Sequence, residues 1–431
     1  MKAKLAVVSG FAAGIAAGFI VGCQTYDFEP VEPLALAQVT QTRDVVSRNL
    51  KPNVVLLVDK SASMDDPVDP ANPKCQRSGG GVCGGTKSTL CNTNPTAPDY
   101  CPTRWSELQG AMSDFLTNAG TVARLGMGVF PAIYDPSTIQ GLCGLPPDPS
   151  QPSGVLMKTD LSQSNDVPGE LQQTADTIKA QLLAITSDVS GKQPNDATFG
   201  GTPTGASLRE LAKNPRLNDP LRQNFVLVLT DGLPNCNPSN TESTCACATA
   251  NPPCPTGTLS CRDNAATVAE VDALRAKNIR TIVVGFGRET GGTGNDVLNE
   301  MAKRGGLPRE CPNGTTAECG GDPCDSGTKL CSPAFYQTQS RSQLVAALAE
   351  IGRRIETGDP CLFVLEAVPS DPRLVSVLID GVNVASGTDT WTYLAPPPAA
   401  RIQLNGAVCE RVRNATQTTK VRVEIRVLQG L

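Results

Sequence analysis

Oxygen-bearing side chains stand at three places in the sequence where an apolar run ends or a helical stretch begins. Carboxylate and hydroxyl oxygens, with no sulfur or nitrogen ligand beside them, suit a hard divalent cation. If the three places meet in the fold, their oxygens form a cation site, for which we expect Mg²⁺, with Mn²⁺ and Ca²⁺ as alternatives. The residues of this predicted metal site are Asp59, Ser61, Ser63, Thr202 and Asp231.

The first of these places has an alternating pattern that favours metal binding over catalysis. Asp59, Ser61 and Ser63 can point to one side of a turning loop, while Lys60 points to the other. Taken alone, this pattern also fits a turn or a helix-capping cluster. A serine nucleophile would need a base, but Lys60 faces away and the chain contains no histidine. We therefore expect no enzymatic activity and no small-molecule substrate.

Apolar runs and amphipathic stretches alternate along the chain, and they must position these oxygens. This order predicts a doubly wound α/β fold with a mostly parallel sheet over residues 50–358. In such a fold, ligands bind at the carboxyl ends of the strands, where Asp59 and Asp231 are expected. The continuously apolar runs, typical of strands covered on both faces, are 54–58, 225–229 and 282–286, with 125–130 as a weaker fourth.

Together the three segments resemble the metal-ion-dependent adhesion site of the von Willebrand factor A family, which includes the inserted domains of integrins. The resemblance implies that the hydroxyls bind the ion directly and that the aspartates act largely through water. It also implies that an acidic group of a partner takes the open position. With its carboxylates held back, the ion stays electrophilic and attracts an external anion. The matching residues are Asp59, Ser61 and Ser63 for the first motif, Thr202 for the threonine and Asp231 for the second aspartate.

The N-terminus has the pattern of a lipoprotein export signal. A short cationic head precedes an apolar stretch that ends at Cys23. A transmembrane anchor is the alternative, although the apolar run is short for a span. The pattern resembles the bacterial lipobox, which implies removal of residues 1–22, lipidation of Cys23 and, from Gln24, sorting to the outer membrane. Residues 23–49 then form a tether.

Most of the 17 cysteines lie in polar, loop-rich insertions rather than in the expected strands and helices. These stretches are too polar to pack by themselves, so disulfides are the expected source of their order. The first two follow strands and should flank the cation site, whereas the third belongs at the opposite end of the sheet. The insertions span residues 64–103, 235–261 and 310–333.

Counting the cysteines of each insertion predicts how they pair. The first and third insertions contain four each and can close internally, but the second contains five. Cys143 should therefore pair with a cysteine of the second insertion, and we expect no free thiol in the mature chain. A thiolate zinc site around Cys245 and Cys247 is the alternative.

The hydrophobic pattern changes to a period of two in the last part of the chain. Residues 359–431 therefore predict a small antiparallel β module, with hairpin signals at Asp380-Gly381 and Asn405-Gly406. Cys361 and Cys409 are the only cysteines of this module, so we expect them to form a disulfide.

Charge and architecture narrow the expected function. The formal net charge is −5 and no basic stripe is present, which argues against a nucleic-acid partner. A lipid anchor, a cation site with Cys-rich insertions and a β tail together resemble myxobacterial lipoproteins of gliding motility. We therefore expect an outer-membrane lipoprotein adhesin, surface-exposed and lipid-anchored, that binds an acidic group on a protein or a surface ligand. The alternative is a periplasm-facing assembly or scaffold lipoprotein that holds an envelope partner through the same site.

Overall fold

The computed structural model describes most of the chain between residues 51 and 427. The predicted signal sequence, Cys23 and the tether lie outside the described residues. Among the described residues, no helix is long and apolar enough to cross a membrane. Within 51–427, the residues left undescribed are 85–89, 163–165, 188–192, 220–221, 242–244, 248–256, 288–294, 358–360, 366–368, 370, 396–399 and 414–420.

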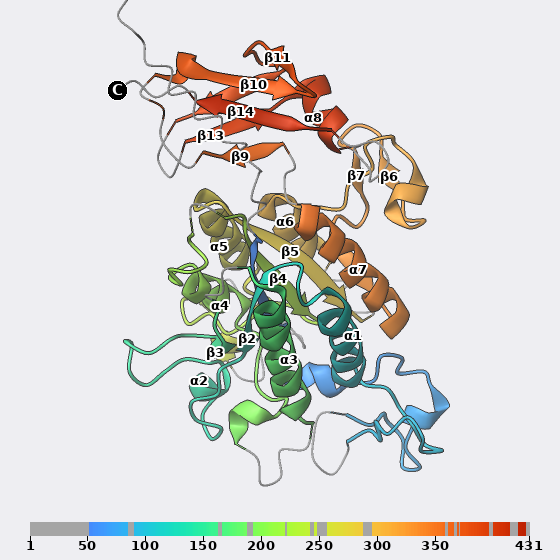
Figure 1. The fold of residues 1–431 in the computed structure, drawn as a ribbon. Coiled ribbons are helices and arrows are strands. Elements are labelled where there is room, and N and C mark those ends of the chain that lie inside the picture. Colours follow the sequence, from blue (N-terminus) through green and yellow to red (C-terminus); the bar gives the residue numbers. More distant parts are fainter. Residues whose placement is uncertain are drawn as a thin grey trace, which may run out of the picture.

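A six-stranded sheet lies at the centre of the fold, in the order β3-β2-β1-β4-β5-β8 (Figure 1). The chain starts in the middle of the sheet and winds outward to both sides, which is the doubly wound arrangement that the sequence predicts. Only β3, an edge strand that the sequence analysis missed, runs antiparallel to its neighbour. The strands are β1 (Asn53–Asp59), β2 (Arg124–Phe130), β3 (Leu156–Thr159), β4 (Asn224–Thr230), β5 (Ile279–Phe286) and β8 (Tyr336–Thr338).

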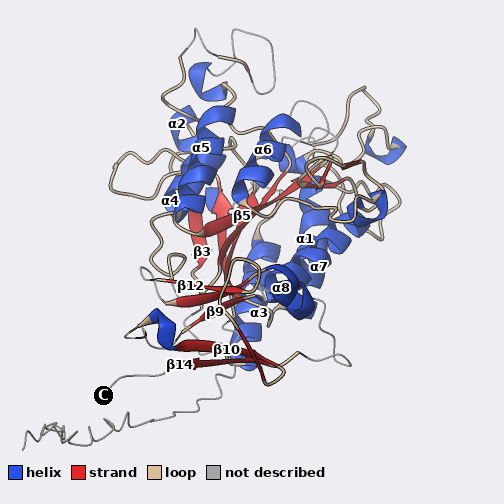
Figure 2. Ribbon diagram, turned by 90° about the horizontal axis from the view of Figure 1, so that it is seen from above, coloured by secondary structure: helices blue, strands red, loops and turns tan. Residues whose placement is uncertain are grey.

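Helices cover both faces of this sheet (Figure 2). Successive residues of a strand point to opposite faces, so Leu56 packs with α1, α3 and α7, whereas Leu57 packs with α4, α5 and α6. All residues of β1 and β4 are buried, which explains their continuously apolar sequences. The helices are α1 (Arg104–Ala119), α2 (Ile139–Leu142), α3 (Pro168–Ala184), α4 (Thr204–Leu211), α5 (Asn264–Ala276), α6 (Asn295–Gly305) and α7 (Arg341–Thr357).

The carboxyl ends of β1 and β4 lie side by side, because these strands pair in parallel with Val58 opposite Leu229. Asp59 is the last residue of β1, and the chain then turns into the short 3-10 helix η1 (Ala62–Asp65). Asp231 directly follows β4. The fold therefore brings the first and third oxygen-bearing segments to one edge of the sheet.

Disulfides join the cysteines of the insertions largely as the sequence predicts. The first and third insertions are cross-linked internally, and Cys143 is bonded to Cys236 of the second. Cys245 is bonded to Cys261, so the alternative prediction of a thiolate zinc site there is wrong. Cys247 is also disulfide-bonded, and Cys254 lies outside the described residues. The described pairs are Cys75–Cys101, Cys83–Cys91, Cys143–Cys236, Cys245–Cys261, Cys311–Cys324, Cys319–Cys331 and Cys361–Cys409.

The C-terminal part contains two three-stranded antiparallel sheets, in the orders β11-β10-β14 and β12-β13-β9. Together with the β6-β7 hairpin of the third insertion, they lie at the end of the molecule away from η1 (Figure 1). The added elements are β6 (Cys324–Asp325), β7 (Leu330–Cys331), β9 (Leu362–Val364), β10 (Val375–Ile379), β11 (Val382–Val384), β12 (Trp391–Leu394), β13 (Arg401–Leu404), α8 (Gly406–Arg413) and β14 (Val423–Val427).

One of the two predicted hairpin turns is present and the other is wrong. Asp380 and Gly381 both have positive φ and join β10 to β11, as expected for a two-residue hairpin turn. Asn405-Gly406 instead lies at the start of α8, whose first residue is Gly406, and the period-two pattern did not predict this helix. Cys409 lies on this helix and its disulfide with Cys361 is buried, so the helix closes over the two sheets through apolar contacts.

Candidate metal centre

Asp59 is buried at the carboxyl end of β1 with both carboxylate oxygens in use. Its Oδ1 accepts the backbone N–H of Ser61 at 2.8 Å, and its Oδ2 accepts the hydroxyl of Thr230 at 2.6 Å. Thr230 ends β4, so this contact ties the two strand ends together. The carboxylate is therefore fixed in orientation and has no exposed surface.

Ser61 and Ser63 continue the cluster toward Asp231. Their hydroxyl oxygens lie 3.1 Å apart, and the Ser63 hydroxyl donates to Asp231 Oδ1 at 3.0 Å. Ser61 and Asp231 are buried, whereas Ser63 is half-buried. Four of the five predicted ligands thus form one continuous polar cluster, which reaches solvent on the side of Ser63.

Thr202 is brought to the same cluster by backbone pairing between two loops. The backbone N–H of Ala62 donates to Gly200 at 3.1 Å, and the N–H of Phe199 donates to Lys60 at 2.7 Å. A Cβ built on Gly232 would lie 3.8 Å from both Ser63 Oγ and Thr202 Oγ1. The two hydroxyls therefore face each other across the space that Gly232 leaves open.

The donor set fits a divalent cation on two observations. Two carboxylates and three hydroxyls converge, and Gly232 has no side chain to fill the space beside them. In addition, the Thr202 hydroxyl makes no hydrogen bond within the described part of the chain, so its oxygen is available to a ligand. Such an all-oxygen site suits Mg²⁺, Mn²⁺ or Ca²⁺.

The electrostatics of the cluster also favour a cation. Burial and the neighbouring Asp231 carboxylate raise the pKa of Asp59 to about 7, although hydrogen bonds from Thr230 and Ser61 act in the opposite direction. Two carboxylates confined in a buried site repel each other and disfavour their charged forms. A divalent cation beside them would remove this repulsion.

Arg104 is a residue of the site that the sequence analysis missed. It is only 3% exposed, and one guanidinium nitrogen donates to Asp231 Oδ2 at 2.6 Å and to the carbonyl of Ser63 at 3.3 Å. Arg104 is the first residue of α1, where a positive charge opposes the helix dipole. An arginine directly after the cap residue Thr103 is therefore unfavourable for the helix. This placement is the sequence signal from which a role for Arg104 could have been predicted.

Asn235 is a second missed residue, and it holds the Thr202 backbone. Its Oδ1 accepts the N–H of Thr202 at 2.8 Å, and its own N–H donates to the Thr202 carbonyl at 2.9 Å. The next residue, Cys236, forms the disulfide with Cys143. A Cβ on Gly201 would lie 2.5 Å from Cys236 Sγ, so this disulfide packs directly against the loop that carries Thr202.

Lys60 points away from the oxygens, as predicted, but it is completely buried. Its amine donates to the carbonyl of Ala197 at 3.2 Å and to that of Pro194 at 3.5 Å. Burial and the nearby Lys158 lower the pKa of Lys60 to about 7. Its role is therefore to hold the loop that leads to Thr202.

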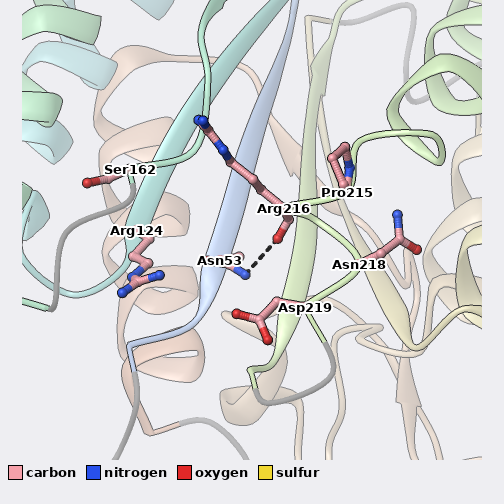
Figure 3. A pocket seen from close by; sticks show the side chains of 7 residues that line it. All are labelled: Asn53, Arg124, Ser162, Pro215, Arg216, Asn218 and Asp219. Atoms are coloured by element: carbon pink, nitrogen blue, oxygen red, sulfur yellow. Dashed lines mark hydrogen bonds between the residues drawn. The ribbon is translucent and has the colours of Figure 1, made fainter. Parts of the chain in front are cut away.

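A pocket of about 360 Å³ lies at the opposite, amino end of the sheet (Figure 3). It contains none of the predicted metal ligands. Its arginines are already paired with acids, Arg124 with Asp166 and Arg216 with Asp160. The lining residues are Asn53, Arg124, Ser162, Pro215, Arg216, Asn218 and Asp219.

Comparison with known proteins gives distant structural likeness only. No family model matches the sequence, and no curated protein matches it. The pilus adhesin SpaC of Lactobacillus rhamnosus GG, in its open conformation, is 13% identical with a TM-score of 0.39. That match covers 88% of this chain but only 39% of SpaC, so the chain spans less than half of its length.

Two further solved structures show likeness of the same order. The vWF domain of the type V pili tip protein Mfa5 from Porphyromonas gingivalis has 12% identity and a TM-score of 0.35, with 72% of this chain and 96% of Mfa5 covered. The manganese-loaded TRAP protein of Plasmodium vivax has 16% identity and a TM-score of 0.30, with 61% and 65% covered. The strand order, the antiparallel edge strand and the two helical layers make the fold von Willebrand A-like.

Proposed function

We propose that this chain is an adhesin that grips an acidic group of its partner through a divalent cation held by Asp59, Ser61, Ser63, Thr202 and Asp231. The observation that carries the proposal is the convergence of these oxygens beside Gly232, with the Thr202 hydroxyl free of hydrogen bonds among the described residues. Hydrolysis is disfavoured because Asp231, the carboxylate that contacts Ser63, is already ion-paired with Arg104, and Lys60 donates to backbone carbonyls elsewhere.

The chain's own residues explain why the ligand should be acidic. Ser61, Ser63 and Thr202 are neutral, and Asp231 already shares its charge with Arg104. A bound divalent cation supplies a Lewis-acidic centre that attracts an anion from outside. Ser63 is the half-buried member of the cluster, so the partner's carboxylate would approach from its side.

The proposal includes an outer-membrane, lipid-anchored position. Cys23 would carry the lipid, and residues 24–49 would hold the folded part away from the bilayer. The predicted lipid anchor, the Cys-rich insertions in an A-like domain and the β tail together resemble the contact-dependent gliding lipoproteins of myxobacteria. We therefore propose that the chain acts at the cell surface, in gliding motility.

Protease shaving of intact cells tests this position. The surface adhesin should be digested without lysis, and Cys23→Ser should lose lipid labelling and membrane retention while staying folded. Protection of the wild-type chain in intact cells would favour the periplasmic scaffold instead. Chelation of divalent cations should release surface attachment without unfolding the chain, because its disulfides and buried strands do not need the metal. Attachment that persists in a chelator would contradict the adhesion mechanism.

A further inference from the structure

The buried ion pair between Arg104 and Asp231 joins three segments at the carboxyl edge of the sheet. Arg104 begins α1, Asp231 follows β4, and the Ser63 carbonyl, which also accepts from Arg104, belongs to the loop after β1. A Cβ on Gly287, directly after β5, would lie 3.0 Å from Arg104 Nε. The side chain therefore passes across the strand ends in a space that a larger residue at 287 would close.

The two oxygens of Asp231 face different partners. Oδ2 accepts from Arg104 at 2.6 Å, while Oδ1 accepts from the Ser63 hydroxyl at 3.0 Å. Arg104 thus holds Oδ2, whereas Oδ1 lies on the side of Ser63 and the candidate cation site. Arg104 consequently sets the rotation of the carboxylate and neutralises part of its charge.

We infer that Arg104 is a positioning residue, the built-in counter-charge that keeps the adhesion site assembled when no divalent cation is bound. This inference rests on the proposed function, because it assigns a role relative to the same cation. Without Arg104, Asp231 would lose its 2.6 Å ion pair while it lies buried beside a second carboxylate, that of Asp59. A divalent cation would then take over the neutralisation, so folding would come to depend on it.

The charge of Arg104 also tunes how tightly the site holds its ion. A fixed positive charge next to Asp231 repels an incoming cation, so the wild-type site should bind cations reversibly rather than permanently. It leaves the bound ion with less compensating negative charge, which favours an acidic partner. Removing the charge should therefore tighten cation binding and increase the stabilisation that the cation provides.

Thermal unfolding of the full-length, disulfide-intact chain in chelator and in saturating Mg²⁺ tests this inference. Arg104→Gln should lower the melting temperature by about 5 °C or more in chelator, because a buried carboxylate loses its partner. Mg²⁺ should restore at least half of that loss, so its stabilising shift should exceed the wild-type shift. Arg104→Lys keeps the charge and should behave nearly as wild type.

Arg222→Gln is the control, since Arg222 forms a half-buried ion pair with Asp166 at 2.9 Å at the other end of the sheet. Its loss of stability should be equal in chelator and in Mg²⁺. A Mg²⁺ shift in Arg104→Gln no larger than in wild type would overturn the inference, as would failure of this variant to fold in both conditions. A wild-type chain that shows no Mg²⁺ shift would instead count against the proposed cation site itself.

Discussion

The two ends of the central sheet differ in how their carboxylates are paired with arginines. At the amino end, Asp166 accepts from Arg222 and Arg124 at 2.9 and 2.8 Å. Burial alone would raise the pKa of Asp166, but these hydrogen bonds hold it below its usual value. At the carboxyl end, Asp59 and Asp231 are fully buried and Arg104 is the arginine paired with Asp231.

The pKa values of the carboxylates differ between the two ends in the same way. At the amino end, Arg124 and Arg222 both contact Asp166, and Arg222 also pairs with Asp219 at 3.4 Å. At the carboxyl end, burial and the neighbouring Asp231 raise the pKa of Asp59 to about 7, and burial raises the pKa of Asp65 to about 6. Buried carboxylates are retained when something compensates them, which at this end we assign to a divalent cation. The nearby Lys60 does not fill that role, because its amine points to backbone carbonyls and its pKa is lowered.

The largest difference in Mg²⁺-dependent adhesion is expected between variants that remove a carboxylate from one end of the sheet or from the other. Asp59→Ala and Asp231→Ala should abolish Mg²⁺-dependent adhesion, since each removes a charge and an oxygen that hold the ion. Asp166→Asn removes a carboxylate at the other end and should leave the Mg²⁺ dependence intact. Adhesion force is measured with and without Mg²⁺ at matched surface abundance. Equal, cation-independent adhesion in wild type and Asp59→Ala would leave the Asp59 loop as an ordinary turn.

The next largest effect is expected for the disulfide at the site. Replacing Cys143 and Cys236 by Ala releases a cross-link across 93 residues, for which loop entropy predicts a stabilisation of about 4.6 kcal/mol. Because this disulfide packs against the Thr202 loop, Mg²⁺ affinity should fall as well. Removing Cys311–Cys324, in the insertion at the far end, should cost stability without changing Mg²⁺ affinity. Equal Mg²⁺ affinities in the two double variants would show that the Cys143–Cys236 disulfide does not act on the site.

A smaller effect on Mg²⁺ affinity is expected from a substitution at Asn235. Asn235→Ala removes the acceptor for the Thr202 N–H while leaving every predicted ligand in place. Residues that orient ligands typically change metal affinity by about 10- to 100-fold, and we expect the lower end of that range. Thr202→Ala, which deletes the ligand oxygen itself, should weaken binding at least as much. Calorimetric titration with Mg²⁺ measures both, and an unchanged affinity in Asn235→Ala would refute its positioning role.

The smallest effect on cation binding is expected at Lys60. The sequence places Lys60 away from the metal ligands, but a completely buried side chain leaves a cavity when truncated. We therefore expect Lys60→Ala to lower the melting temperature, Lys60→Met to lower it less, and Lys60→Met to keep Mg²⁺ affinity within about threefold of wild type. A larger loss of affinity in a folded Lys60→Met chain would make Lys60 part of the site.

The sequence predicted the core of the fold because local patterns there agree with the global structure. Continuously apolar runs became buried parallel strands, and polar residues at their ends met at one edge. Cysteine counting placed the partner of Cys143 in the second insertion, where the structure shows it to be Cys236. These inferences need only the hydrophobic pattern, the direction of the strands and whether the number of cysteines in an insertion is even or odd.

What the sequence did not predict depends on long-range contacts. Arg104 acts on Asp231 from 127 residues away, and Asn235 acts through hydrogen bonds to the Thr202 backbone. The short edge strand β3 is half-buried and too brief for a clear period. In the C-terminal part, a helix followed Asn405-Gly406 because Cys409 and its neighbours pack over the sheets, where tertiary packing outweighed a local turn signal.

The most direct measurement is the binding of Mn²⁺ to the full-length chain, followed by the electron paramagnetic resonance signal of the free ion. Wild type, Asp59→Asn and Asp166→Asn are compared, because both variants remove a carboxylate at nearly constant volume, a buried one at Asp59 and a half-buried one at the other end of the sheet. We expect wild type and Asp166→Asn to bind Mn²⁺ at a site from which Mg²⁺ displaces it. We expect Asp59→Asn to have lost this site. Equal Mn²⁺ binding by all three chains, or none by wild type, would contradict the assignment of the site.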